Sequence, residues 1–158
     1  MGFFNNVQTF NQPIASWDTS NVTSMFYMFR EAKAFNQNIG SWNVSNVRSM
    51  HMMFRICHAF NNGGSPSISS WNTANVTDMH AMFNESYVFN QNISSWNTAN
   101  VTNMSVMFNT ASVFNQNLSG WNVAKVTRSA FFATNSPLAL PENSGKLPPF
   151  TAAANNTY

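Results

Sequence analysis

The sequence predicts a repeat solenoid, a fold in which successive short coils of chain stack along one axis. One pattern, written FNQNIGSWNVSNVRSMHMMF at residues 35–54, recurs almost five times. Apolar residues hold the same places in each copy, which is typical of units that bury their apolar faces only against one another. A tryptophan marks every copy, at intervals of 25, 29, 25 and 25 residues: Trp17, Trp42, Trp71, Trp96 and Trp121.

Each coil of about 25 residues is expected to contain a short β-strand and a short helix. Val22, Met25 and Phe29 follow the spacing i, i+3, i+7, which places them on one face of a helix of about two turns. The stretch from Ile14 to Trp17 has no helical period, and we interpret it as a short strand. A straight strand would point these two side chains to opposite faces. A bend between them would restore a common face, and the sequence leaves both possibilities open.

Stacking of five coils would place equivalent side chains in ladders about 4.8 Å apart. Such columns form one continuous core, and stability then grows through contacts between neighbouring coils. Inward-facing tryptophans would each need an acceptor for the indole N–H. Outward-facing ones would instead form an aromatic platform suited to sugar rings. The predicted structural ladder consists of the tryptophans Trp17, Trp42, Trp71, Trp96 and Trp121 and the phenylalanines Phe29, Phe54, Phe83 and Phe108.

Two segments are expected along the chain. Residues 1–133 form the repeat domain, which starts within a repeat, and the Pro-rich residues 134–158 form a cap over the last coil or an arm on a neighbouring molecule. A four-residue insertion near 63–66 should bulge from one corner, because Gly-Gly and Pro form turns. The bare first coil is expected to invite docking. The predicted contact region comprises Gly63, Gly64, Pro66, Pro148, Pro149 and Phe150.

Composition argues against several classes of partner. Charged residues make up only 8% of the chain, the net charge is +2, and no run of Lys and Arg suited to nucleic acid is present. No apolar stretch reaches the length of a membrane span, and no signal peptide is visible. Cys57, the one cysteine, reads as a small buried residue. The sequence therefore predicts neither a nucleic-acid partner nor a membrane span.

Neither catalytic residues, nor metal ligands, nor a cofactor site are predicted. A catalytic site needs titratable groups that converge, whereas the carboxylates occupy mostly different positions of the repeat. His51 and His80 share one repeat position, where we expect solvent-facing side chains. P-loop, nucleophile-elbow, zinc-ligand and Rossmann patterns are all missing from the sequence.

Asparagines precede Val-Thr at the same position of three coils: Asn21, Asn75 and Asn100. The triplet matches the N-glycosylation pattern. Its recurrence at one coil position argues instead that these asparagines cap the start of the expected helix or form a hydrogen-bonded ladder.

The repeated unit, FNQxIxxWNxxNVTxMxxMF, resembles the repeat of the BspA-like leucine-rich-repeat surface-protein family. The similarity covers about residues 3–133 and includes the aligned Trp, Val, Met and Met-Phe positions. It implies a leucine-rich-repeat-like solenoid with a role in adhesion or protein contact, and it brings no catalytic motif to transfer. Members of that family are typically surface-exposed or lipid-anchored proteins.

From these features the sequence predicts a non-enzymatic structural or protein-interaction solenoid whose partners are other proteins in a surface or other large assembly. One alternative is a minor structural, capsid-associated protein of a virus particle. Another is a cell-surface adhesion or carbohydrate-binding module. The corresponding locations are the cell surface or extracellular space and the virion surface.

Overall fold

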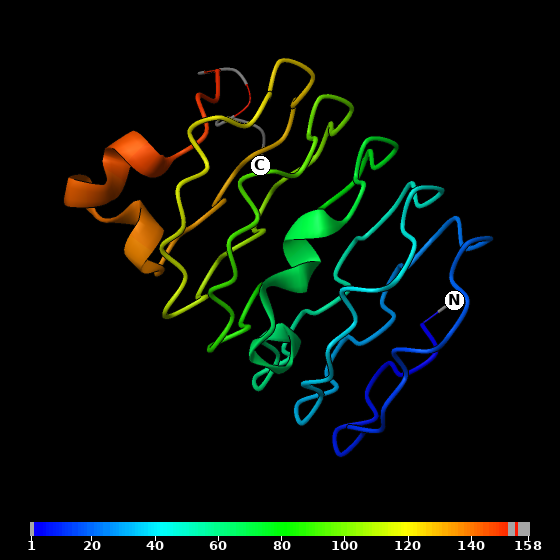
Figure 1. Cartoon of the computed structure of the whole chain (residues 1–158). Coiled ribbons are helices and arrows are strands. Elements are labelled where there is room, and N and C mark those ends of the chain that lie inside the picture. Colours follow the sequence, from blue (N-terminus) through cyan, green and yellow to red (C-terminus); the bar gives the residue numbers. More distant parts are fainter. Residues whose placement is uncertain (1, 152–153, 155–158) are drawn as a thin grey trace.

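Successive repeats lie side by side as parallel coils in the computed structural model, which describes residues 2–151 and 154 (Figure 1). The first coil lies at one end of the stack, and the C-terminal segment lies at the other. Neighbouring coils pair at one equivalent position through isolated parallel bridges: Ser24 with Ser49, Ser49 with Asp78, Asp78 with Asn103, and Asn103 with Arg128. The helices within residues 2–151 are four short 3-10 turns: η1 (Asn62–Gly64), η2 (Pro66–Ser70), η3 (Pro137–Ala139) and η4 (Pro141–Lys146).

The helix expected around residues 22–29 is not formed, so this prediction was wrong. The chain there makes consecutive four-residue turns, in which the Met28 amide donates to the Met25 carbonyl at 3.2 Å and the Ala32 amide to the Phe29 carbonyl at 3.0 Å. The third residue of each turn has a positive φ, 58° at Tyr27 and 62° at Glu31, as a type II turn requires. A chain of such turns brings every third or fourth residue to one side, and therefore imitates the apolar spacing of a helix.

The strand expected from Ile14 to Trp17 is also a turn. The Trp17 amide donates to the Ile14 carbonyl at 3.1 Å, and the same bond joins Trp42 to Ile39. The turn supplies the bend that gives both side chains a common face, since Ile39 and Trp42 are both buried. Parallel pairing occurs instead near Ser24, inside the segment expected to be helical.

Backbone hydrogen bonds join each coil to the next in a regular ladder. The amides of Met25, Tyr27 and Phe29 donate to carbonyls 24 residues later, at 2.9, 3.1 and 2.9 Å. The corner residues with positive φ take part in this ladder, including the β-branched Ile56 and Val106. Positive φ is unfavourable for such side chains. The bonds between coils therefore hold a local geometry that the residues at the corners would not adopt alone.

Two columns of phenylalanine form the centre of the core. Within one coil, Phe54 and Phe60 stack with ring centroids 3.9 Å apart; between coils, Phe54 and Phe83 stack at 5.5 Å and Phe60 and Phe89 at 5.9 Å. The spacing between coils exceeds the expected 4.8 Å because these are centroids of offset rings, the arrangement that aromatic pairs prefer.

The four-residue insertion lies within the segment that forms η1 and η2, in the middle of the stack (Figure 1). Asn62 fixes it to the preceding coil: this side chain is fully buried, and its Oδ1 accepts the Ile39 amide at 2.9 Å. The Gly63 amide donates to Asn36 Oδ1 at 3.0 Å, and its φ of 61° suits glycine. The insertion is therefore an ordered part of its coil.

The described part of the C-terminal segment lies over the last coil (Figure 1). The Leu118 amide donates to the Lys146 carbonyl at 2.8 Å, Leu138 is fully buried, and the Phe150 ring meets Phe132 edge-on at 4.9 Å. Residues 134–151 therefore pack on the last coil, and we call this part the cap. Residues 152–153 and 155–158 lie outside the described residues.

Candidate functional site

Four of the five ladder tryptophans lie inside the core. Their exposed fractions are 2–3%, whereas Trp17 of the first coil is 45% exposed. Each buried indole donates to a carbonyl of the preceding coil: Trp42 to Ile14 at 3.0 Å, Trp71 to Ile39 at 3.3 Å, Trp96 to Ile68 at 3.0 Å and Trp121 to Ile93 at 3.2 Å. These rings consequently form no outward-facing platform for sugars.

The remaining predicted core residues also lie inside. The ladder phenylalanines Phe29, Phe54, Phe83 and Phe108 are fully buried. Cys57 is buried as well, and its Sγ donates to the carbonyls of Phe29 and Ala32. Burial raises the pKa of this thiol, which disfavours the reactive thiolate.

A ladder of asparagines at one edge of the stack was missed by the sequence analysis, although every copy carries Phe-Asn. Each side-chain Oδ1 accepts the backbone amide of its counterpart in the next coil, along the series Asn11, Asn36, Asn61, Asn90 and Asn115. At the far end Lys146 Nζ donates to Asn115 Oδ1 at 3.0 Å. The cap thus ends the ladder by supplying the donor that a further coil would provide.

Two of the three asparagines of the Asn-Val-Thr triplets belong to a second ladder. Asn75 Nδ2 donates to the Ser45 carbonyl at 2.7 Å, and Asn100 Nδ2 donates to the Ala74 carbonyl at 2.9 Å. No helix follows for them to cap within residues 2–151. Of the two structural roles predicted for these residues, the structure shows the ladder.

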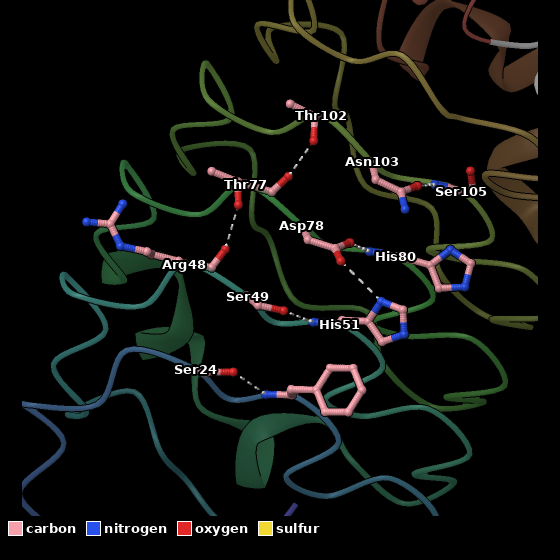
Figure 2. Close-up of polar contacts among 11 residues, drawn as sticks. Ser24, Arg48, Ser49, His51, Thr77, Asp78, His80, Thr102, Asn103 and Ser105 are labelled. Carbon is pink, nitrogen blue, oxygen red and sulfur yellow. Dashed lines mark hydrogen bonds and ion pairs between the residues drawn. The ribbon is translucent and has the colours of Figure 1, made fainter. Parts of the chain in front are cut away.

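One column of side chains differs from coil to coil, at the position of Phe26, His51, His80, Ser105 and Ala130. Phe26 is exposed, the two histidines are half-buried, and Ser105 and Ala130 are buried. The first three rings stack: Phe26 and His51 have centroids 5.0 Å apart, and His51 and His80 4.8 Å apart. We call these five equivalent positions the ring column; rings occupy its first three positions. Figure 2 shows the two histidine rings beside the polar residues that orient them.

Polar side chains two residues earlier fix the backbone of the ring column. Asp78 Oδ1 accepts the His80 amide at 2.9 Å, and Asn103 Oδ1 accepts the Ser105 amide at 3.1 Å (Figure 2). Asp78 Oδ2 also lies 3.2 Å from His51 Nδ1, which links two coils. Beside them, Thr77 Oγ1 donates to the Arg48 carbonyl, and Thr102 Oγ1 donates to the Thr77 carbonyl.

Burial and neighbouring charges shift the pKa of one histidine of the ring column. Burial, followed by the neighbouring charges of His51 and Arg128, lowers the pKa of His80, and Asp78 opposes this change only in part. Both Asp78 oxygens are already engaged, one by the His51 ring and one by the His80 amide. Asp78 therefore contacts the His51 ring and fixes the backbone at His80.

A groove of about 420 Å³ opens beside the positions of the ring column that carry no ring. Beyond His80 the equivalent positions carry the small side chains of Ser105 and Ala130. Apolar atoms supply most of the lining surface, and Phe131 is 57% exposed. The residues that line the groove are His51, His80, Asn103, Ser105, Val106, Arg128, Ala130 and Phe131.

The predicted contact residues do not form one surface. Gly63, Gly64 and Pro66 are exposed on the insertion, which lies against the coil of Asn36. In the cap, Pro149 is exposed and Phe150 is half-buried. Pro148 is buried, so its inclusion as a contact residue was wrong: packing of the cap on the last coil covers it.

Two further searches cover the described residues alone. Among residues 2–151 and 154, no group of three or more His, Cys, Asp or Glu side chains is placed to hold a metal ion. Over the same residues, no helix has the length and apolar character needed to cross a membrane.

Comparison with known proteins adds one finding. A family model described as "Mycoplasma protein of unknown function, DUF285" matches residues 1–66 and again residues 63–139. The two matches meet at the four-residue insertion. No curated protein and no solved structure matches the chain.

Proposed function

Because the chain belongs to the family described as "Mycoplasma protein of unknown function, DUF285", we propose from its structure that it is a non-enzymatic protein-interaction module. The proposal includes a leucine-rich-repeat-like solenoid architecture, and the resemblance of the repeat to that of the BspA-like surface proteins supports it. Its partners are other proteins of a surface or larger assembly.

One observation carries this proposal: the recurring residues serve the stack, whereas the ring column differs from coil to coil and leaves the rings of Phe26, His51 and His80 at least partly exposed. Tryptophans and phenylalanines fill the core, and asparagines link coil to coil. The ring column, by contrast, changes from Phe26 to His51 to Ser105 on an unchanged backbone. A rigid frame that displays variable side chains at fixed spacing is the arrangement by which repeat proteins bind other proteins.

The position of the tryptophans argues against carbohydrate binding by a Trp platform. Trp71 and Trp96 stack on each other, but both rings are 3% exposed and their N–H groups are used within the stack. Stacking on a sugar ring requires an open aromatic face, which these residues do not offer.

A parallel screen tests the proposal. The chain, first shown by light scattering to be monodisperse, is immobilised and probed with a random peptide display library and with a glycan array. The control is the double variant His51→Ser, His80→Ser, which gives the ring column the small side chain that Ser105 already has. Its thermal transition and circular dichroism establish that it is folded.

We expect peptides to be enriched on the native chain and to be lost on the variant. Glycan binding without peptide enrichment, or enrichment of no ligand at all, would contradict a protein-interaction function.

A further inference from the structure

The groove lies where the stack of rings in the ring column stops. Phe26, His51 and His80 continue one another at 5.0 and 4.8 Å. The next two positions keep the same backbone pairing, through Asn103 and Arg128, but carry Ser105 and Ala130. The groove lies beside these two small residues, and both His51 and His80 are among the residues that line it.

The groove has apolar walls and a polar side chain that can donate a hydrogen bond. Val106 and Phe131 give it apolar walls, and Phe131 remains 57% exposed. Asn103 lies at the groove with its Oδ1 used by the Ser105 amide, which leaves its Nδ2 group outside that bond (Figure 2). A flat apolar ring fits between such walls, and a donor at the edge favours a ligand with an acceptor group.

Arg128 gives the groove its charge preference. The ion pairs among the described residues join Arg30 to Glu31 and His51 to Asp78, so Arg128 has no carboxylate partner there. Its charge acts on His80, which places it close to the ring. Asp78 is engaged on both oxygens. A ligand that carries a negative charge next to an aromatic ring therefore complements the groove.

We propose that this groove binds an aromatic side chain accompanied by a carboxylate, presented by a segment of a partner protein. The aromatic ring stacks on His80 and continues the ring column through the space beside Ser105. The carboxylate pairs with Arg128, and the Asn103 amide donates to the same segment. The inference rests on the proposed protein-interaction function and names the chemistry of its partner.

The test uses N-acetyl-tryptophan as the probe, with N-acetyl-tryptophanamide as its uncharged match and glucuronate as a carboxylate on a sugar ring. Binding is followed by NMR through the Cε1 proton of His80 and the amides of Ser105 and Val106. Two variants of the full chain separate the contribution of the groove's open space from that of its positive charge. Ser105→His fills the groove with a side chain that the same position already carries in two coils, and Arg128→Gln removes the charge.

We expect saturable upfield shifts at His80 with the aromatic carboxylate, and about 2- to 5-fold weaker binding of the amide, the range of an exposed ion pair. Arg128→Gln should abolish that preference while retaining the ring-dependent shifts. Ser105→His should weaken binding at least about tenfold, because its ring occupies the site. Arg48→Gln, at an exposed arginine outside the groove lining, is the matched control. It should change neither the affinity for the probe nor the preference for the carboxylate over the amide.

Equal binding to native chain and Ser105→His, no saturable shift, or a glucuronate response equal to that of the aromatic probe would overturn the proposal. A dimer of the native chain that Ser105→His abolishes would overturn it too, because a second copy would then fill the groove. If peptides selected in the screen above do not compete with the probe, the groove is not their binding site, although the protein-interaction function stands. If no peptide is selected and the probe does not bind, both proposals are overturned.

Discussion

The two ends of the stack place the same repeat residues in different surroundings. At the C-terminal end the cap covers the last coil, and Trp121 is 2% exposed. At the N-terminal end Trp17 is 45% exposed and Phe3 70% exposed. The two tryptophans occupy the same repeat position, so the difference arises from the neighbours alone. Burial of a ladder residue is set by the coil on each side of it.

The largest expected effect contrasts tryptophans inside the stack with the one at its end. Trp96→Ala should lower the free energy of unfolding by roughly 3–5 kcal/mol, because it removes a buried aromatic side chain and one of the two hydrogen-bond donors to the Ile68 carbonyl, the other being the Trp71 amide. Trp17→Ala should cost less than half of that, since its ring is half exposed. Urea unfolding of both variants measures the difference, and equal losses would show that position in the stack does not control burial.

Within the cap, two leucines give a second contrast. Leu138→Ala should lower the free energy of unfolding by about 2–5 kcal/mol, because Leu138 is fully buried against the core. Leu140 is 46% exposed, and its replacement by Ala should change stability by no more than about 0.5 kcal/mol. Chemical denaturation under one set of conditions compares the two. A similar small effect for both would mean that the cap does not pack on the last coil in solution.

The end of the asparagine ladder predicts a smaller effect. Lys146→Met should cost about 1 kcal/mol, because Asn115 Oδ1 loses the donor that ends the ladder. Lys125 also donates to an asparagine, Asn100, but lies exposed on the stack. Lys125→Met should therefore cost less than Lys146→Met in the same thermal or urea experiment. The reverse order would count against a capping role for Lys146.

The smallest effect concerns pH in the middle of the stack. Burial lowers the pKa of His80 in the folded chain below its ordinary value of 6.5. Between these two values the unfolded chain binds the additional proton, so stability falls as the pH decreases from 6.5 through the folded pKa. The groups that face His80 are His51, Asp78, Arg55 and Arg128. Denaturation at a series of pH values should show a flatter profile for His80→Gln; an unchanged profile would exclude His80 as its source.

Sequence alone could identify the repeat and the residues that share a position, because identical side chains recur at fixed intervals. It could not identify the local structure: the spacing of Val22, Met25 and Phe29 suits a helix and a chain of turns equally well. The choice between them depends on positive φ at Tyr27 and Glu31, which are not residues that favour it. Bonds to the next coil hold them there, and such bonds are not visible within one repeat.

The candidate site was less accessible to sequence reasoning than the core. The ring column could be seen as a variable position holding His51 and His80, but its groove depends on which small residues follow which rings across coils. The asparagine ladder could have been found from the recurrent Phe-Asn, since a polar residue kept in every coil indicates a bond between coils. Pro148 was misplaced because proline content alone does not distinguish a buried cap from an exposed arm.

The most direct test of this account is exchange of the five tryptophan indole protons with deuterium, followed by NMR. The account predicts four slowly exchanging indole resonances, from Trp42, Trp71, Trp96 and Trp121, whose N–H groups donate to the preceding coil. It predicts one rapidly lost resonance, which a Trp17→Phe variant should remove. Rapid loss of all five resonances in a folded chain would contradict a stack held together through its buried tryptophans.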